Sequence, residues 1–187
     1  MNKKTFSVDV QDIRRRARGQ LDQGAVTESY GADRATVIEM LNSALATELV
    51  CSLRYRRHYY MAQGIHSESV KEEFLEHANE ELEHAGMLAG RIVQLGGEPD
   101  FNPDTLSERS HAEYVEGGDL VGMIEENLVA ERIAIDSYRL MIQYIGAGDP
   151  TSRRILEQVL AVEEEHAEEL VSLLRNLDSG EALRNVG

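Results

Sequence analysis

Apolar side chains recur every three or four residues along four long segments of the chain, the spacing that lines one face of an α-helix. The segments cover residues 32–63, 67–97, 119–145 and 149–176. Gly64 and Gly146 follow the first and third segments, Gly96-Gly97 ends the second, and Asp149-Pro150 opens the fourth, as expected at helix ends. No segment shows the strict alternation that a half-buried strand needs. The pattern therefore predicts four helices, each roughly 40–48 Å long at 1.5 Å per residue.

The connections between these helices predict how they are arranged. The first and third connections span only a few residues, so each joins two helices into an antiparallel hairpin. The second, residues 97–118, holds Pro99 and Pro103 and is long enough to run the length of a bundle. We therefore predict an all-α fold, a four-helix bundle of two antiparallel hairpins joined by one long crossover. The bundle is expected over residues 32–178, after an arm of residues 1–31 and before a short tail of residues 179–187.

One polar pattern occurs in both predicted hairpins. The first helix of each hairpin carries a Glu in the middle of its apolar stripe, and the second helix carries Glu-x-x-His. The two Glu residues of a hairpin are separated by 33 residues in the first and 32 in the second. A single Glu-x-x-His arises by chance in a chain this rich in Glu, but two at matched distances are a specific signal. The residues of the pattern are Glu48, Glu81, His84, Glu131, Glu163 and His166.

The chemistry of these six side chains points to metal. Four isolated carboxylates inside a bundle would cost several kcal/mol each and would be protonated. Two divalent cations shared among them remove that cost. Carboxylate oxygens with imidazole suit iron or manganese, and zinc accepts the same ligands. A third Glu-x-x-His, at Glu108 and His111, lies in the irregular crossover and is set aside.

The chain resembles the bacterioferritin and ferritin-like di-iron family over nearly all of residues 33–176. The resemblance is carried by the motifs above and by two stretches, LNSALATELVCSLRYRRHYYM and FLEHANEELEHAGMLAGRIVQLGGEPDF. It implies two iron ions per subunit, with Glu48 and Glu131 as terminal ligands and Glu81 and Glu163 as bridges. His84 and His166 would each bind one iron. The implied activity is that of a ferroxidase, which oxidises Fe(II) with O2 or H2O2 and stores ferric mineral in a homo-oligomeric shell.

Two departures from that family refine the expectation. Haem-binding members carry Met directly after the bridging Glu of the second helix, where this chain has Leu82, so no haem is expected. The tail is too short and polar for the fifth helix of bacterioferritins, so a shell of 12 subunits competes with one of 24. The ligand set nevertheless lies within one chain, unlike the between-subunit site of typical DNA-protecting miniferritins (the Dps type).

Four further residues lie near the ligand positions. Tyr55 and Tyr138 each follow a single Glu by seven residues. They could hydrogen-bond a ligand carboxylate or donate an electron, or they could be ordinary core tyrosines. Cys51 could line the cavity or react with peroxide, against the alternative of a small buried side chain. His77, one turn before Glu81, could assist the ligands or iron uptake, or simply pack in the core.

Charge divides the chain into two parts. The net charge is −15, but residues 1–18 carry six Lys and Arg against two Asp, so the remaining body is near −19. Such a body disfavours DNA, whereas the arm Arg14-Arg15-Arg16-Ala17-Arg18 could hold phosphates or pair with an acidic neighbouring subunit. No apolar run approaches the roughly 20 residues of a membrane span. Without a hydrophobic signal core, and with a single Cys, a cytoplasmic protein is expected.

Other functions share this ligand pattern. A di-iron oxygenase or hydroxylase on a small or lipid substrate uses the same spacing but would want an apolar channel, and a peroxidase is a further alternative. A Dps-like DNA-protecting protein would use the basic arm. The ferroxidase interpretation is favoured because the acidic surface suits the uptake of cations.

Overall fold

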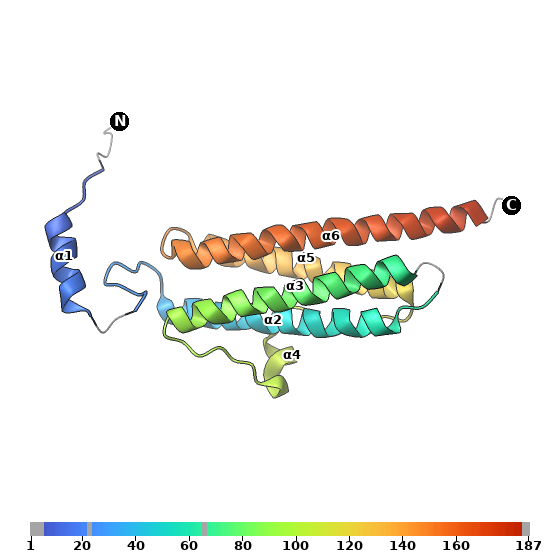
Figure 1. The fold of residues 1–187 in the computed structure, drawn as a ribbon, viewed down its shortest axis with the longest axis horizontal. Coiled ribbons are helices and arrows are strands. Elements are labelled where there is room, and N and C mark those ends of the chain that lie inside the picture. Colours follow the sequence, from blue (N-terminus) through green and yellow to red (C-terminus); the bar gives the residue numbers. More distant parts are fainter. Residues whose placement is uncertain (1–5, 22–23, 65–66, 185–187) are drawn as a thin grey trace.

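Four long helices form the body of the molecule. The computed structural model describes residues 6–21, 24–64 and 67–184, with side chains as far as Leu177, and this part of the chain contains no strand. The helices α2 (Arg34–Met61), α3 (Ser67–Gln94), α5 (Leu120–Ile145) and α6 (Pro150–Arg184) lie side by side (Figure 1). α2 pairs with α3, and α5 pairs with α6. The predicted all-α bundle of two hairpins and one crossover is confirmed.

Three of the four long helices begin at a capping Asp. The side chains of Asp33, Asp119 and Asp149 each accept a hydrogen bond from the backbone N–H three residues on, at 2.8–2.9 Å. Such a cap satisfies one of the N–H groups that the first helical turn leaves without a partner. At the other ends, Gly96 and Gly146 adopt positive φ angles of 77° and 51°, which residues with a Cβ rarely adopt.

The last helix is longer than its apolar pattern predicted. We expected it to end near Asn176, but the backbone of α6 stays helical to Arg184. The sequence after Asn176 contains no Pro, and Glu181, Ala182 and Leu183 are good helix formers, so the helix continues through Gly180 although Gly disfavours a helix interior. Residues 179–184 of the predicted tail are thus helical, and residues 185–187 lie outside the described residues.

The crossover follows α2 along the outside of the bundle. It contains a short 3-10 turn, η1 (Pro103–Thr105), and the single-turn helix α4 (Leu106–Arg109). Three polar side chains spaced along α2 bind the backbone of the crossover. Thr47 Oγ1 accepts a hydrogen bond from His111 N at 2.9 Å. Arg54 Nη1 donates to Glu113 O at 2.9 Å, and Arg57 Nη1 donates to Glu116 O at 2.8 Å. These bonds satisfy backbone N–H and C=O groups of the crossover that would otherwise need water molecules as partners.

The core has two apolar clusters with a polar layer between them. One cluster, around Leu41, Leu88, Ile92 and Leu156, fills the end of the bundle near the start of α2. The other, around Phe74, Ile124 and Leu170, fills the opposite end. The middle of each helix therefore lies between two well-packed regions, which hold the polar side chains there in place.

α2 is the one helix of the described chain whose length and mean hydropathy, 1.3, would also suit a membrane span. This is weak support for a membrane role, because the core helix of a soluble bundle passes the same test. Here 56% of the apolar window is buried in the bundle, and it includes the charged side chain of Glu48.

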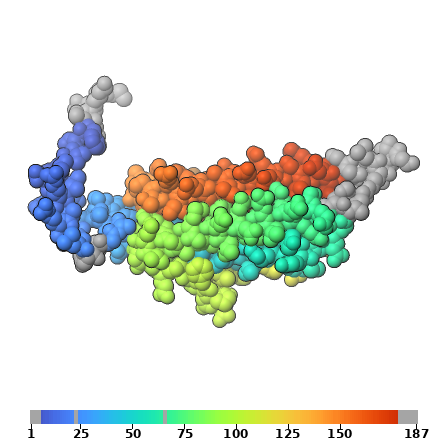
Figure 2. Space-filling model, in the orientation of Figure 1, coloured from blue at the N-terminus to red at the C-terminus, as the bar shows by residue number. Residues whose placement is uncertain are grey.

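The arm holds a separate short helix, α1 (Val10–Gly19), which stands off one end of the bundle (Figures 1 and 2). None of its residues is buried, and Val10 and Ile13 are about half exposed. Two of its arginines, Arg15 and Arg16, pair with Asp12 on the same helix. The division into arm, bundle and tail stays a prediction.

Candidate metal centre

The six side chains of the repeated pattern meet halfway along the bundle, between the two apolar clusters. They come from all four long helices, because the stripe-centred position of each Glu points to the bundle axis. Each is at most 4% exposed. The contributions are Glu48 from α2, Glu81 and His84 from α3, Glu131 from α5, and Glu163 and His166 from α6.

One group of ligand atoms surrounds His84. Its Nδ1 lies 3.0 Å from Glu163 Oε1, 3.2 Å from Glu48 Oε2 and 3.6 Å from Glu81 Oε2. One ligand atom from each of the four residues lies within 4.8 Å of the others. Three carboxylates and an imidazole at this spacing can all reach a single divalent cation.

A second group surrounds His166. Its Nδ1 lies 3.6 Å from Glu163 Oε2, 3.9 Å from Glu81 Oε1 and 3.9 Å from Glu131 Oε2. Glu81 and Glu163 thus direct one oxygen to each group, whereas Glu48 belongs to the first group only and Glu131 to the second. This is the arrangement that two bridging and two terminal carboxylates require.

Several of these atoms need a partner that the protein does not supply. Glu81 Oε1, Glu131 Oε2, Glu163 Oε2 and His166 Nδ1 are buried and have no hydrogen-bond partner in the described chain, and Glu163 Oε1 has only the unaligned contact with His84. Buried polar atoms without partners are costly, and acceptor atoms collected at one point are suited to a cation. The donor set therefore fits two divalent metal ions.

The close approach of the four buried carboxylates also shifts the pKa values of the metal-free centre. Burial and the neighbouring carboxylates raise the pKa values of Glu81 and Glu131 well above the ordinary range. Burial opposes the charged form of His84 and His166, but their contacts with Glu163 and other carboxylates raise the pKa to about 10 and about 9. Without cations the centre therefore holds several protons.

A tyrosine supports each terminal carboxylate, but from the other hairpin. Tyr138 of α5 donates its hydroxyl to Glu48 Oε1 on α2, and Tyr55 of α2 donates to Glu131 Oε1 on α5. Both tyrosines are buried, and burial with the adjacent carboxylates raises the pKa of each hydroxyl. They therefore remain hydrogen-bond donors and fix the orientation of the Glu48 and Glu131 carboxylates.

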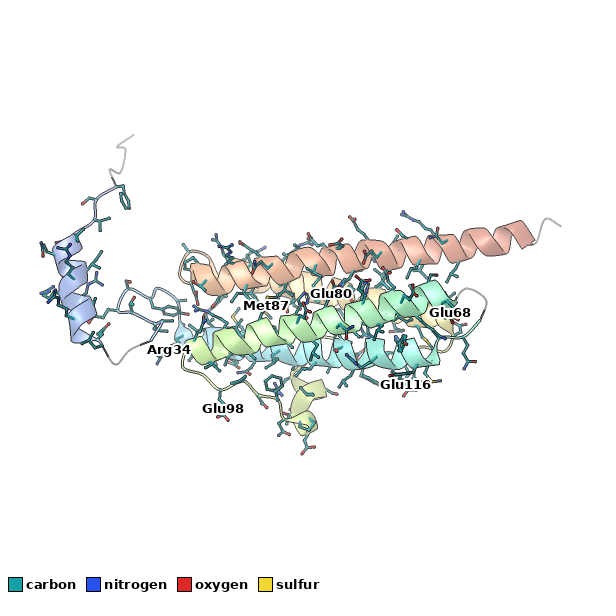
Figure 3. The ribbon with its side chains drawn as sticks, viewed as in Figure 1. Arg34, Glu68, Glu80, Met87, Glu98 and Glu116 are labelled. Carbon is teal, nitrogen blue, oxygen red and sulfur yellow. The ribbon has the colours of Figure 1, made fainter. Side chains whose placement is uncertain are left out.

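One contact of the centre, between His166 and Glu80, was not predicted from the sequence. The outer nitrogen of His166, Nε2, lies 2.8 Å from Glu80 Oε2, so a carboxylate on α3 orients a ligand of α6. Glu80 is labelled in Figure 3, where it lies on α3 below α6. One residue before Glu81 it is off the ligand face of its own helix, and only the packing of α6 against α3 makes it part of the site.

Cys51 is near the centre but is not poised for reaction. It is 2% exposed, and its sulfur accepts a weak hydrogen bond from Arg54 Nη2 at 3.7 Å. Burial raises the pKa of the thiol, which favours the protonated form over the reactive thiolate.

The fold has counterparts among known proteins. The sequence profile of the Ferritin-like domain family matches residues 38–179, most of the chain. The chain belongs to the ferritin-like family. This ferritin-like protein is 32% identical over 141 residues to the nutrient stress-induced DNA-binding protein of a Synechococcus species, covering 74% of this chain and 80% of that one. It is 30% identical over 138 residues to the bacterioferritin of Rhodobacter capsulatus, covering 72% and 80%.

Solved structures show the same fold. The dodecameric thioferritin of Bacteroides fragilis, a bacterioferritin-related protein, superposes with a TM-score of 0.79 at 27% identity and covers 92% of this ferritin-like chain and 98% of its own. The Rhodobacter capsulatus bacterioferritin, described with a metal-free dinuclear site and haem iron, gives a TM-score of 0.69 at 26% identity and covers 79% and 89%. Haem-binding members carry Met directly after the bridging Glu of the second helix. In this ferritin-like chain the residue at that position is Leu82, which is half exposed on α3.

Proposed function

We propose that this protein is a ferroxidase that oxidises Fe(II) at an intrasubunit pair of metal positions and stores the product in a multimeric shell. The observation that carries the proposal is the division of oxygens at the centre. Glu81 and Glu163 each present one oxygen to the His84 group and the other to the His166 group. Two cations held by shared carboxylates are close enough to give electrons to one oxidant molecule.

Charge balance supports the binding of two cations together. Four deprotonated glutamates carry four negative charges, and two Fe(II) ions carry four positive charges, so the loaded centre is neutral if both imidazoles are neutral. With a single cation, protons on the carboxylates or imidazoles would have to balance the remaining negative charge, whereas two cations balance it alone. Two Fe(II) ions together give up two electrons, the number that reduces O2 to H2O2 or H2O2 to water.

Iron is the cation that the family favours, whereas the ligands alone would also accept manganese or zinc. A relative at 30% identity is a bacterioferritin. We propose iron as substrate and cargo, no haem, and a shell of 12 or 24 subunits in the cytoplasm. The near-complete match to a dodecameric relative favours 12.

Stopped-flow mixing of Fe(II)-loaded protein with O2 or H2O2 tests the proposal. The assembled protein should oxidise two Fe(II) per subunit in a fast phase and retain the ferric product through gel filtration. The variant Glu81→Gln should lose the fast phase, and Glu83→Gln, an exposed acid on the same helix, should keep it. Assembled wild-type protein that neither consumes oxidant nor retains iron would refute the ferroxidase function.

A DNA-coating function is the second candidate, because a relative at 32% identity is named as DNA-binding and the arm carries four arginines within five residues. Arg14 and Arg18 would then contact phosphates together with the two arginines that pair with Asp12. A salt-titrated gel shift comparing the full chain with one lacking residues 1–20 measures this. If both proteins shift DNA equally, or if neither shifts it, the arm is rejected as a DNA-binding element.

A further inference from the structure

A second cluster of metal-ligating side chains lies beside the metal centre, on the seam between α3 and α6. His77 of α3 directs Nε2 to Glu169 Oε2 of α6 at 3.0 Å and to Glu73 Oε1 of α3 at 3.7 Å. One ligand atom from each of the three residues lies within 4.8 Å of the others. None of them belongs to the six ligands described above.

His77 is the element that distinguishes this cluster from a patch of surface acids. Its side chain is 1% exposed, while the side chains of Glu73 and Glu169 are 27% and 42% exposed. A buried imidazole thus forms the floor, and two carboxylates reach the floor from the solvent side. Two oxygens and one nitrogen on one side of a cation leave its other positions to water, as suits a site from which the cation can leave.

The same imidazole connects the cluster to the metal centre. The ring of His77 stacks on that of His166, with centroids 3.9 Å apart and planes 21° apart. A ligand atom of His77 also lies within 4.8 Å of ligand atoms of Glu131 and His166. Its Nδ1 is buried and has no hydrogen-bond partner in the described part of the chain. One ring therefore lies between the outer carboxylates and the inner ligands.

The seam is open to solvent at this point. A cavity of about 90 Å³ between α3 and α6 reaches His166 and is lined chiefly by acidic side chains: Glu76, Glu80, Glu165 and Glu169. Its negative charge concentrates cations at its mouth. Glu169 belongs both to this cavity and to the outer cluster, so a cation drawn to the cavity meets the cluster directly.

We propose that Glu73, His77 and Glu169 form a third, mononuclear divalent-cation site that holds Fe(II) next to the metal centre before the ion moves inward. This inference rests on the proposed ferroxidase function for the fate of the ion, whereas the binding site itself stands on geometry alone. The ion keeps its charge and oxidation state in this step, which exchanges ligands only.

Anaerobic equilibrium dialysis of the assembled protein against Zn(II) tests the site without oxidation. Wild-type protein should bind three ions per subunit and the double variant Glu73→Gln/Glu169→Gln two. The control Glu72→Gln/Glu168→Gln removes the same charge from exposed positions of the same helices and should bind three. The variant Glu81→Gln/Glu163→Gln should keep one ion, with an anomalous scattering peak at His77 Nε2.

The outcomes separate the two proposals. Two ions in both wild-type protein and Glu73→Gln/Glu169→Gln would overturn the third site and leave the metal centre intact. No ion lost in Glu81→Gln/Glu163→Gln relative to wild type would overturn the metal centre instead. Kinetically, Glu73→Gln/Glu169→Gln should slow Fe(II) oxidation about tenfold at limiting Fe(II) and leave the final extent unchanged. A rate equal to that of the Glu72→Gln/Glu168→Gln control would overturn the holding role.

Discussion

At the scale of single residues, the carboxylates of the candidate metal centre differ in pKa because each one contacts different neighbours. Glu163 touches both histidines, and burial, which opposes its ionisation, is outweighed by those contacts, so its pKa falls to about 2. Glu81 lies among other carboxylates, and burial and their charge raise its pKa instead. One centre thus contains carboxylates of opposite acid strength, which share protons until cations replace them.

The first prediction is that cation binding becomes tighter as pH rises. In the metal-free protein His84 and His166 have pKa values of about 10 and about 9, so both are protonated at neutral pH. Cations must displace these protons and those on Glu81 and Glu131, and the affinity for a pair of Zn(II) ions should therefore fall as pH drops from about 8 to 6, with about four protons released per pair. Calorimetry in buffers of different ionisation enthalpy measures the protons. Binding without proton release would contradict these pKa shifts.

The second prediction concerns the two tyrosines. Tyr138→Phe removes the donor to Glu48, and Tyr55→Phe removes the donor to Glu131. Each change should weaken binding of one of the two inner cations about 10–100-fold, because the ligand loses its orienting partner. Zn(II) titration followed by calorimetry should resolve the weakened ion. Tyr144→Phe, at an exposed position on α5, is the control and should leave both affinities unchanged.

At the scale of the helices, one buried ion pair joins three parts of the chain at the end of the bundle. Asp149 caps α6, receives Arg91 Nη2 from α3 at 2.9 and 3.0 Å on its two oxygens, and accepts from the Tyr30 hydroxyl at 2.9 Å. Arg91 Nε also donates to Ser152 Oγ at 2.8 Å. These bonds hold the end of α3 and the start of α6 together, and those two helices carry four of the six ligands.

The third prediction is that Asp149→Ala destabilises the protein by about 3–5 kcal/mol, since it leaves Arg91 buried without its counter-charge. Denaturant unfolding of the metal-free protein measures the free energy. Adding Arg91→Leu to Asp149→Ala should recover about half of the loss, because the unpaired charge is then gone. A double variant less stable than Asp149→Ala would show that Arg91 stabilises the protein by packing rather than by charge.

At the scale of the whole molecule, the candidate metal centre draws side chains from all four long helices and brings four carboxylates together in the core. Cations that bind the folded bundle and not the unfolded chain stabilise it by mass action, about 2.7 kcal/mol when the cation is at 100 times its dissociation constant. Because the ligands come from both hairpins, this stabilisation also holds the two hairpins together.

The fourth prediction follows from that linkage. Saturating Zn(II) should raise the Tm of wild-type protein by roughly 5–10 °C, at 2–4 °C per kcal/mol for a chain of this size. Glu81→Gln should melt near metal-free wild type, since Glu81 already favours its neutral form there, and Zn(II) should raise its Tm far less. Calorimetric scans measure both, with Glu83→Gln as control. An equal Tm rise in Glu81→Gln would mean that the ions bind elsewhere.

The helices and the repeated ligand pattern could be predicted from the sequence because both depend on local geometry. A period of 3.6 residues places Glu48 and the other ligands on the buried face of their own helices, and short links force antiparallel neighbours. The end of α6 was missed because the apolar stripe fades near Asn176 while the helical backbone continues to Arg184. An apolar stripe reports which face of a helix is buried, and it gives no signal for where a helical backbone ends.

Contacts between helices were decided only by the tertiary structure. The sequence determined that Tyr55 and Tyr138 lie on ligand faces, but not that each bonds the Glu of the opposite hairpin. Nor did it bring Glu73 and His77 of α3 to Glu169 of α6, which lies 92 residues beyond His77. The physical reason is that helical periodicity specifies which way a side chain faces on its own helix. Its partner depends on the rotation and sliding of one packed helix against another.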